Sequence, residues 1–245
     1  MNIPCKKCKK TFEVRPKMAD CVMTDPPYNV DYSGDGKNTK NKILNDNMTP
    51  AQFDTFLGAV FARYSEVTKK GAALYVFHSS STQAQFEKAI DSAGMEVRQQ
   101  LIWNKPTMSM GWSHYRWKHE PFFYCGFKDK KTQWYGDRTN PTVLDFHASE
   151  AQLIAWVKKE KRLEQEGKTT IWTMKRANVQ EYIHSTQKPV ELIVYALVNS
   201  SKHDDIVLDL FAGSGSTLIA CEKSGRVSYS MELDCRYIDL IISRY

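Results

Sequence analysis

The 245-residue sequence contains no uninterrupted run of about 18 apolar residues. Its Lys-rich beginning also carries no apolar signal segment. We therefore expect a soluble, cytoplasmic protein without a membrane partner. No internal repeat is present, and the 42% hydrophobic content is enough to bury one substantial core, which favours a single α/β unit with an inserted region.

The six cysteines do not form a complete disulfide or metal framework. Only Cys5 and Cys8 are closely spaced, and they resemble one knuckle of a zinc ribbon, which supplies two of the four ligands of a tetrahedral zinc site. No second such pair follows, so we expect no stoichiometric zinc; a site completed by distant residues or by a second chain is the alternative. Single cysteines in apolar stretches are predicted to be buried, reduced thiols: Cys21, Cys125, Cys221 and Cys235.

The excess of positive charge is small, with a formal net charge of +6 and a pI near 8.9. Such an excess suits a polyanionic partner such as DNA, but it is also common in proteins that never bind nucleic acid. Charge alone therefore does not decide the class of partner.

The motif Asp25-Pro26-Pro27-Tyr28 comes directly after an apolar run, residues 21–24, that is predicted to be a strand. Pro27 has no N–H and keeps Pro26 extended, so the Pro26 carbonyl has no partner in a strand. This carbonyl and the Asp25 carboxylate can accept both protons of an aromatic amine while Tyr28 stacks on the ring. The motif predicts a site that polarises a flat amine toward an electrophile, and an ordinary Pro-Pro turn is the alternative.

A second motif, residues 207–217, is an apolar run that breaks into a glycine-rich turn before a helical stretch. Gly213 and Gly215 permit positive φ and the close approach of a ligand, and the helix that follows offers N–H groups to an anion. The turn lacks the Gly-Lys-Ser/Thr of a P-loop, and Leu218 replaces the third glycine of a dinucleotide fingerprint. Glu232 ends the next predicted strand, where an acidic residue can bind ribose hydroxyls. The motif predicts a site for an adenosine-containing ligand.

Together the two motifs resemble those of the amino DNA methyltransferases, a family that uses S-adenosylmethionine (SAM) as its methyl donor. Residues 184–192, HSTQKPVEL, resemble the segment that precedes the glycine loop in this family and helps to hold the methionine end of SAM. The catalytic motif comes before the glycine loop, as in the circularly permuted β class. The resemblance extends from about residue 18 to residue 245.

The resemblance implies a Rossmann-like α/β fold with strand order 3-2-1-4-5-7-6, in which the strand before Asp25 lies beside the strand before Phe211. Both motifs would then meet outside the carboxyl ends of central strands. The catalytic residues that it implies are Asp25, Pro26, Pro27 and Tyr28. Glu232 would bind the ribose, and Thr186 and Lys188 would lie near the methionine carboxylate. The other implied cofactor-binding residues are Asp25, Asp209, Phe211, Ala212, Gly213, Ser214, Gly215, Ser216 and Thr217.

Four regions are expected: an N-terminal Cys-x-x-Cys segment (1–17), a catalytic half (18–127), a target-recognition region (128–183) and a SAM-binding half (184–245). The N-terminal segment departs from the family, which usually carries upstream a strand ending in Gly-Asp near the SAM adenine. Residues 11–14 are a candidate replacement for that edge strand. Hydrophobic periodicity predicts helices over 50–69, 82–93, 149–167, 190–199, 218–223 and 236–245 and strands over 73–78, 95–103, 121–127, 169–173, 205–210 and 227–231.

The loop 112–120 combines aromatic and cationic side chains, which either stack on bases and contact phosphates or cover the edge of the sheet. Arg and Asn in the target-recognition region can make paired hydrogen bonds with base edges. The candidate DNA-binding residues are Tyr115, Arg116, Lys118, Arg138, Asn140, Lys175, Arg176 and Asn178.

The sequence thus predicts a site-specific methyltransferase acting on the N6 amine of adenine in double-stranded DNA, by base flipping and direct in-line attack. An N4-cytosine enzyme is the nearest alternative, although relatives of that type usually have Ser in place of Asp25. RNA adenine methylation and a degenerate DNA-binding domain are further alternatives. The resemblance also allows a homodimer and a cognate restriction enzyme as partners.

Overall fold

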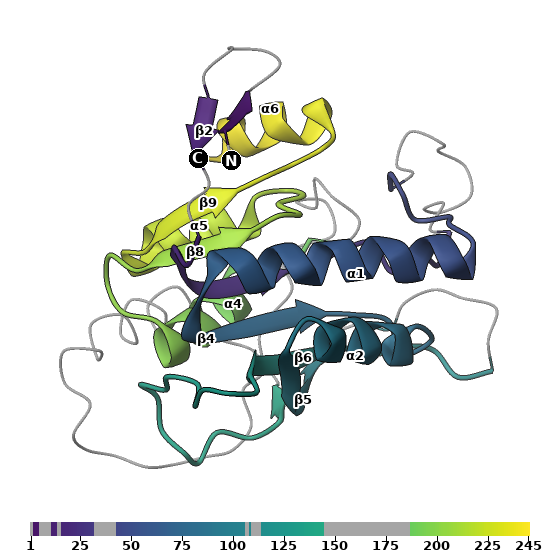
Figure 1. Ribbon diagram of the computed structural model, residues 1–245, viewed down its shortest axis with the longest axis horizontal. Helices are drawn as coiled ribbons and strands as arrows, with labels where there is room; N and C mark the ends of the chain where they lie inside the picture. The colour runs from purple at the N-terminus through teal and green to yellow at the C-terminus, as the bar shows by residue number, and fades with distance from the viewer. Residues whose placement is uncertain are drawn as a thin grey trace.

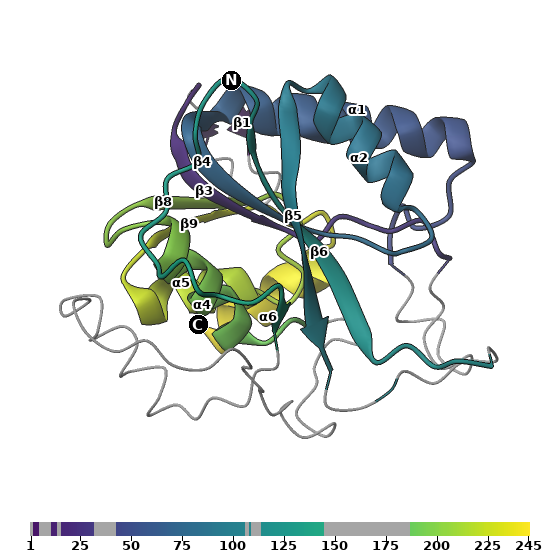
Figure 2. The same cartoon turned by 90° about the horizontal axis from the view of Figure 1, so that it is seen from below.

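The fold is seen in a computed structural model that describes residues 2–4, 11–13, 16–31, 43–105, 108, 114–144 and 187–245. Strands from both halves of the sequence form one mixed sheet of seven strands, in the order β7-β5-β6-β4-β3-β8-β9. Helices cover both faces of this sheet (Figures 1 and 2). Within the described part of the chain, no helix has the length and apolar character needed to cross a membrane.

The centre of the sheet is parallel and one side of it is antiparallel. β3 (Ala19–Thr24) pairs in parallel with β4 (Thr68–Phe77) and with β8 (Ile206–Asp209), and β8 pairs in parallel with β9 (Val227–Ser230). β6 (His119–Phe127) runs antiparallel to both β4 and β5 (Met95–Asn104), while the short β7 (Val143–Leu144) pairs in parallel with β5. β3, which precedes Asp25, and β8, which precedes Phe211, are therefore neighbours, as expected.

Two hydrophobic clusters bury the two faces of the sheet. α1 (Pro50–Val67) and α2 (Gln83–Ser92) cover one face, whereas α4 (Val190–Ser200) and α5 (Ser216–Ser224) cover the other, with α6 (Cys235–Arg244) on the same side (Figure 2). The start of α1 is fixed by a reciprocal capping box between Thr49 and Gln52, with Pro50 at the first helical position. Continuous apolar strands such as β4 are expected for a sheet that is buried on both faces.

The predicted helices and strands within the described residues are confirmed, apart from shifts at their ends. The full order 3-2-1-4-5-7-6 is not confirmed, because the described sheet ends at β9 on one side and gains β7 on the other. Within the described part of the chain, residues 11–13 do not supply a replacement edge strand: β2 (Thr11–Glu13) pairs with β1 (Asn2–Pro4) in a two-stranded sheet separate from the main one. The predicted helix 149–167 and strand 169–173 lie outside the described residues.

Two further differences from expectation concern single positions and the inserted region. Cys21, Cys125 and Cys221 are buried free thiols, as predicted, but Cys235 is exposed because α6 buries none of its side chains. The beginning of the 128–183 region belongs to the main body, since β7 joins the sheet and the backbone N–H of Tyr135 donates to the carbonyl of Asn199 on α4.

Candidate active site

The catalytic motif begins where β3 ends, beside the end of β8. Asp25 follows Thr24 in an extended segment, and the buried Pro26 follows it. Within the described part of the chain, the Pro26 carbonyl accepts no hydrogen bond, as its two prolines predict. Neighbouring parallel strands thus deliver Asp25 and the glycine loop to the same edge of the sheet, where open α/β sheets bind their ligands.

Both oxygens of the Asp25 carboxylate have partners. The Tyr28 hydroxyl donates to Oδ1 at 2.5 Å, and the Lys188 ammonium donates to Oδ2 at 2.6 Å. Burial and the adjacent Asp25 raise the pKa of Tyr28, so the phenol stays protonated and can act as a donor. The ring of Tyr28 packs edge-on against Phe86 of α2, with the centroids 6.4 Å apart.

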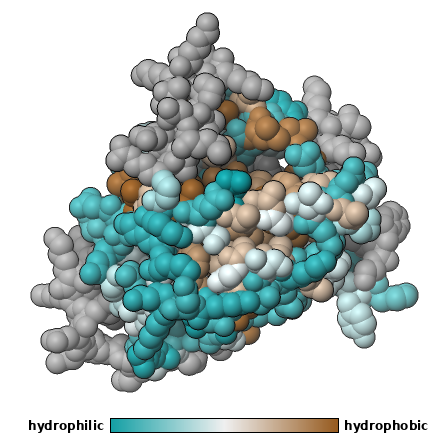
Figure 3. Space-filling view, viewed as in Figure 1, coloured by the Kyte–Doolittle hydropathy of each residue, from teal (hydrophilic) through white to brown (hydrophobic). Residues whose placement is uncertain are grey.

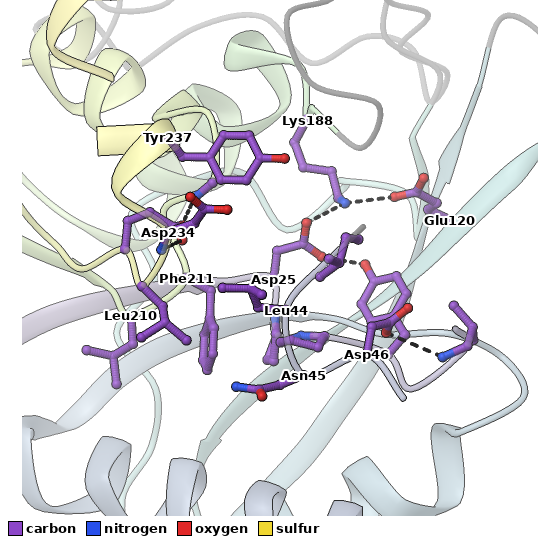
Figure 4. Close-up of a pocket in the computed structure, with 18 residues that line it drawn as sticks. Asp25, Leu44, Asn45, Asp46, Glu120, Lys188, Leu210, Phe211, Asp234 and Tyr237 are labelled. Atoms are coloured by element: carbon purple, nitrogen blue, oxygen red, sulfur yellow. Dashed lines mark hydrogen bonds and ion pairs between the residues drawn. The ribbon is translucent and has the colours of Figure 1, made fainter. Parts of the chain in front are cut away.

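Lys188 also contacts a second carboxylate, that of Glu120 at the start of β6. Its Nζ lies 3.1 Å from Glu120 Oε2 (Figure 4). On the other side, Lys105 Nζ lies 2.5 Å from Glu120 Oε1. Burial alone would raise the pKa of Glu120, but the two ammonium groups outweigh it and lower the pKa to about 2. Burial would lower the pKa of Lys188, yet Asp25 and Glu120 raise it above its usual range. The site therefore holds an alternating row of charges: Asp25, Lys188, Glu120 and Lys105.

Asp25, Glu120 and Lys188 line a cavity of about 190 Å³ between the catalytic motif, the glycine loop and α6. Its remaining wall is largely apolar and includes Leu44, Leu210, Phe211 and Leu233, of which Leu44 and Leu233 are exposed. Figure 3 shows a small hydrophobic group of residues on the surface between α1 and α6. Toward α2 the same face is mainly hydrophilic. A cavity with apolar walls and a few polar groups in fixed positions is typical of a small-molecule or base-binding site.

Asn29, the residue after the catalytic motif, fixes the next wall of the cavity. Its side-chain oxygen accepts from the Met48 N–H at 2.6 Å and its amide donates to the Met48 carbonyl at 3.0 Å. The buried Asp46 accepts from the backbone N–H of Asn29 at 2.7 Å. These bonds tie residues 43–48, which include the cavity residues Leu44 and Asn45, to the end of the catalytic motif.

The glycine loop is held by Asp209 at the end of β8. Asp209 is 3% exposed and accepts hydrogen bonds from the backbone N–H of Phe211 and from the Thr217 hydroxyl, at 2.9 and 2.7 Å. Burial raises its pKa to about 7, against the opposing effect of these hydrogen bonds. Gly215 has φ of +82°, and a Cβ there would lie 3.0 Å from Ile241 of α6, so both conformation and space require glycine.

Glu232 spans the loop from its far side. One carboxylate oxygen accepts from the backbone N–H of Gly213 at 2.7 Å and the other from that of Asp234 at 2.8 Å. Each carboxylate oxygen has a further lone pair, so Glu232 can still accept from a ligand. It lines the 190 Å³ cavity, and the ribose-binding role expected for it stays a prediction.

A smaller cavity of about 40 Å³ adjoins the first, between Lys188 and the beginning of α5. Two side-chain atoms that line it, Ser216 Oγ and Gln187 Oε1, are buried without a hydrogen-bond partner among the described residues. Buried polar atoms are normally paired, so these two are candidates to bind a ligand. Asp209, Phe211, Ala212, Gly213, Ser214, Ser216 and Thr217 line this cavity.

Comparison with known proteins shows the family of this chain. Residues 19–243 match the N6/N4 methyltransferase model described as DNA methylase. The chain belongs to the DNA methylase family. It is 25% identical to the type II methyltransferase M.HinfI of Haemophilus influenzae, over 92% of this chain and 62% of that protein. It is 26% identical to the DNA adenine methyltransferase YhdJ of Escherichia coli K12, over 92% of this chain and 75% of that one. This DNA methylase thus spans less than two thirds of M.HinfI.

Solved structures support the fold. The complex of M1.HpyAVI with SAM aligns with a TM-score of 0.60 and 19% identity, covering 94% of this DNA methylase and 90% of that chain. The cytosine-N4-specific PvuII DNA methyltransferase aligns with a TM-score of 0.66 and 16% identity, covering 94% and 80%. Both adenine and cytosine enzymes therefore occur among the similar proteins, so the family does not decide the base.

The predicted DNA-binding residues are placed only in part. Tyr115, Arg116 and Lys118 are exposed, and Tyr115 is 89% exposed, so its ring does not cover the sheet edge. Arg138 and Asn140 line a different cavity, between the sheet and α4, where the Tyr195 hydroxyl donates to the Asn140 side chain. Thr186 and the remaining candidates Lys175, Arg176 and Asn178 lie outside the described residues, as do Cys5 and Cys8.

Four residues of the site were not among those predicted: Glu120, Lys105, Asn29 and Asp46. Glu120 stood in the sequence as a single acid in a loop rich in cations, and its partner Lys188 lies far along the chain. Lys188 was expected near the methionine carboxylate, which stays a prediction; its ammonium contacts Asp25 and Glu120, and the residue lines both cavities. Sequence spacing gave no signal for these pairings, because they join separate segments of the chain.

Proposed function

We propose that this DNA methylase transfers a methyl group from SAM to the N6 amine of adenine in double-stranded DNA. The observation that carries the proposal is the juxtaposition of two sites. The Asp25 carboxylate and the Pro26 carbonyl lie in the same cavity as the glycine loop and Glu232. An amine held by the first site would face a methyl donor held by the second, and such positioning can supply much of a rate enhancement.

SAM, when bound, supplies an electrophilic methyl group on a sulfonium. Asp25 and the Pro26 carbonyl would accept the two amine hydrogens, and Tyr28 would offer a face to the flipped adenine. The amine nitrogen forms the new N–C bond as the S–C bond breaks, and it loses one proton. Asp25 is placed to receive that proton, and no covalent bond to the chain is required.

Several observations fit a bound SAM. Ser216 Oγ is an unpaired buried hydroxyl at the start of α5, whose cap Gly215 provides no side-chain bond, so the helix end can bind a carboxylate. Glu232 can accept from ribose hydroxyls, and the half-buried Phe211 forms apolar wall of both cavities. The glycine loop has no side chain at Gly213, which leaves its backbone open to the ligand.

Binding to DNA is expected to involve the exposed cations of the loop before β6. A target amine inside a duplex is out of reach, so the nucleotide must be flipped out of the stack. The affinity should fall with salt with a log–log slope of about −0.9 per phosphate contacted. Arg116→Ala and Lys118→Ala should each flatten that slope, whereas Lys223→Ala on α5 should not; a slope unchanged by the first two would contradict their assignment.

The alternative product is N4-methylcytosine, favoured by the structural similarity to a cytosine-N4 enzyme. A degenerate DNA-binding domain would give no product. Transfer of labelled methyl from SAM to mixed duplex DNA, with the product nucleoside identified by mass spectrometry, separates the three. N6-methyladenine supports the proposal, while N4-methylcytosine alone or no transfer contradicts it. Expression in a methylation-free bacterial host followed by modification-sensitive sequencing would then give the recognition sequence.

A further inference from the structure

The Lys188 ammonium is shared between the catalytic carboxylate and a second carboxylate that no role has been given. Its side chain is 7% exposed, and its Nζ is 2.6 Å from Asp25 Oδ2 and 3.1 Å from Glu120 Oε2. Figure 4 shows the lysine reaching between the two acids. The rings of Phe77 and Tyr28 lie 4.8 and 5.8 Å from Nζ and close the site around the ammonium. The ammonium can therefore form an ion pair with either carboxylate, but it has little access to water.

The contact between Lys188 and Asp25 conflicts with substrate binding. Tyr28 already donates to Asp25 Oδ1, and Lys188 donates to Oδ2 along a short, charge-assisted bond. A neutral aromatic amine is a weaker donor than an ammonium. Each oxygen of Asp25 keeps a further lone pair, but the amine would have to share that oxygen with Tyr28 or Lys188, so it competes poorly while the ammonium stays in place.

Glu120 removes this conflict. If Lys188 had Asp25 as its single partner, moving it away would leave a buried ammonium unpaired, which is strongly unfavourable. With Glu120 at 3.1 Å, a small movement transfers the ion pair from one carboxylate to the other, and no charge is left alone. Lys105, 2.5 Å from Glu120 Oε1, holds Glu120 in place during that exchange.

We propose that Glu120 is a positioning residue for methyl transfer, which accepts the Lys188 ammonium when the target amine takes its place on Asp25. This inference rests on the proposed methyl transfer. Glu120 touches neither the base nor the cofactor in this scheme and acts through Lys188.

The test is the single-turnover rate of methyl transfer to duplex DNA at saturating SAM. Glu120→Gln keeps the size of the side chain and removes its charge, so Lys188 stays on Asp25 and the rate should fall about 10- to 100-fold. Binding of S-adenosylhomocysteine, measured by calorimetry, should change less than about twofold, because Glu120 contacts Lys188 and Lys105 and makes no hydrogen bond to the described glycine loop. The matched control is Glu96→Gln, which removes an exposed ion pair with Arg98 on the same hairpin and should leave the rate unchanged.

A second substitution distinguishes positioning from mere support of the fold. Adding Lys188→Met to Glu120→Gln removes the competing ammonium, so the double variant should transfer faster than Glu120→Gln alone. If Glu120 only stabilises the hairpin, the double variant will be slower or equal, and the proposal is overturned. A wild-type rate for Glu120→Gln overturns it as well. Should Glu120→Gln fail to fold, Glu120→Asp replaces it, with an intermediate rate expected.

The failure of the proposed function would look different. In that case the wild-type protein would transfer no methyl group to DNA, and all variants would be equally inactive. If the wild-type protein transfers methyl groups and Glu120→Gln does so at the same rate, only the positioning role of Glu120 is contradicted.

Discussion

Two aspartates at the ends of neighbouring parallel strands are held in opposite ways. Asp209, at the end of β8, is almost fully buried and bonds a backbone N–H and the Thr217 hydroxyl. Asp25, just beyond β3, has a side chain that is 27% exposed, and both its partners are long side chains, Tyr28 and Lys188. Side chains can exchange partners more readily than a packed backbone. The comparison indicates that Asp209 builds a fixed loop, whereas Asp25 must stay available to a substrate.

The largest expected effect is on catalysis at Asp25. Asp25→Ala removes an acceptor whose hydrogen bond strengthens as the amine nitrogen becomes tetrahedral, so single-turnover methyl transfer should fall about 10²–10³-fold. Binding of S-adenosylhomocysteine should weaken much less than the rate falls, because Asp25 is one of many residues expected to contact the cofactor. The rate of labelled methyl transfer and a calorimetric titration measure the two quantities. Near-normal transfer by this variant would remove Asp25 from the mechanism.

Substitutions of Tyr28 test whether this residue stacks on the base or only donates a hydrogen bond to the Asp25 carboxylate. Tyr28→Ala removes the face on which the base would stack and should cost about 1–3 kcal/mol in holding it. Tyr28→Phe keeps that face and loses only the hydrogen bond to Asp25, so its cost should be about 1 kcal/mol. Transfer rates and the fluorescence of 2-aminopurine at the target position report both. Equal losses in the two variants would assign Tyr28 to Asp25 alone.

Glu232 resembles Asp209 more than Asp25, because both its carboxylate oxygens accept from backbone N–H groups. Glu232→Ala should weaken SAM binding by about 1–3 kcal/mol, the cost of leaving buried polar groups unpaired. It should also lower the melting temperature, since Gly213 and Asp234 lose their acceptor. Glu232→Gln keeps one acceptor oxygen and should lose less of both. An unchanged SAM affinity in Glu232→Ala would show that Glu232 does not contact the ribose.

Local patterns in the sequence were sufficient to predict the central sheet and both loops of the site. Apolar runs followed by Asp25-Pro26 and by Gly213-x-Gly215 indicate strand ends, and the pairing of β3 with β8 brings these ends together. The contact of Lys188 with Asp25 and with Glu120 could not be predicted, because tertiary packing brings these three residues together from separate segments of the chain. The role of residues 11–14 was predicted wrongly for a similar reason: short strands carry little information about which sheet they join.

The effect furthest from catalysis concerns Asp209 and is a dependence of stability on pH. Burial raises the pKa of this carboxyl to about 7, well above its value of about 3.9 in an unfolded chain. The folded state therefore binds a proton that the unfolded state has released between these two values. The contribution to stability is full below about pH 4, declines as the pH rises through about 7, and is constant above that.

Asp209→Asn carries no titrating group there, so its unfolding free energy in urea should depend less on pH between about 4 and 7 than that of the wild type. Thr132→Ala, a change far from this loop, serves as the control and should keep the wild-type slope. If Asp209→Asn keeps that slope as well, the pKa of Asp209 is not raised in the folded protein, and burial does not distinguish this loop-building aspartate from the catalytic one.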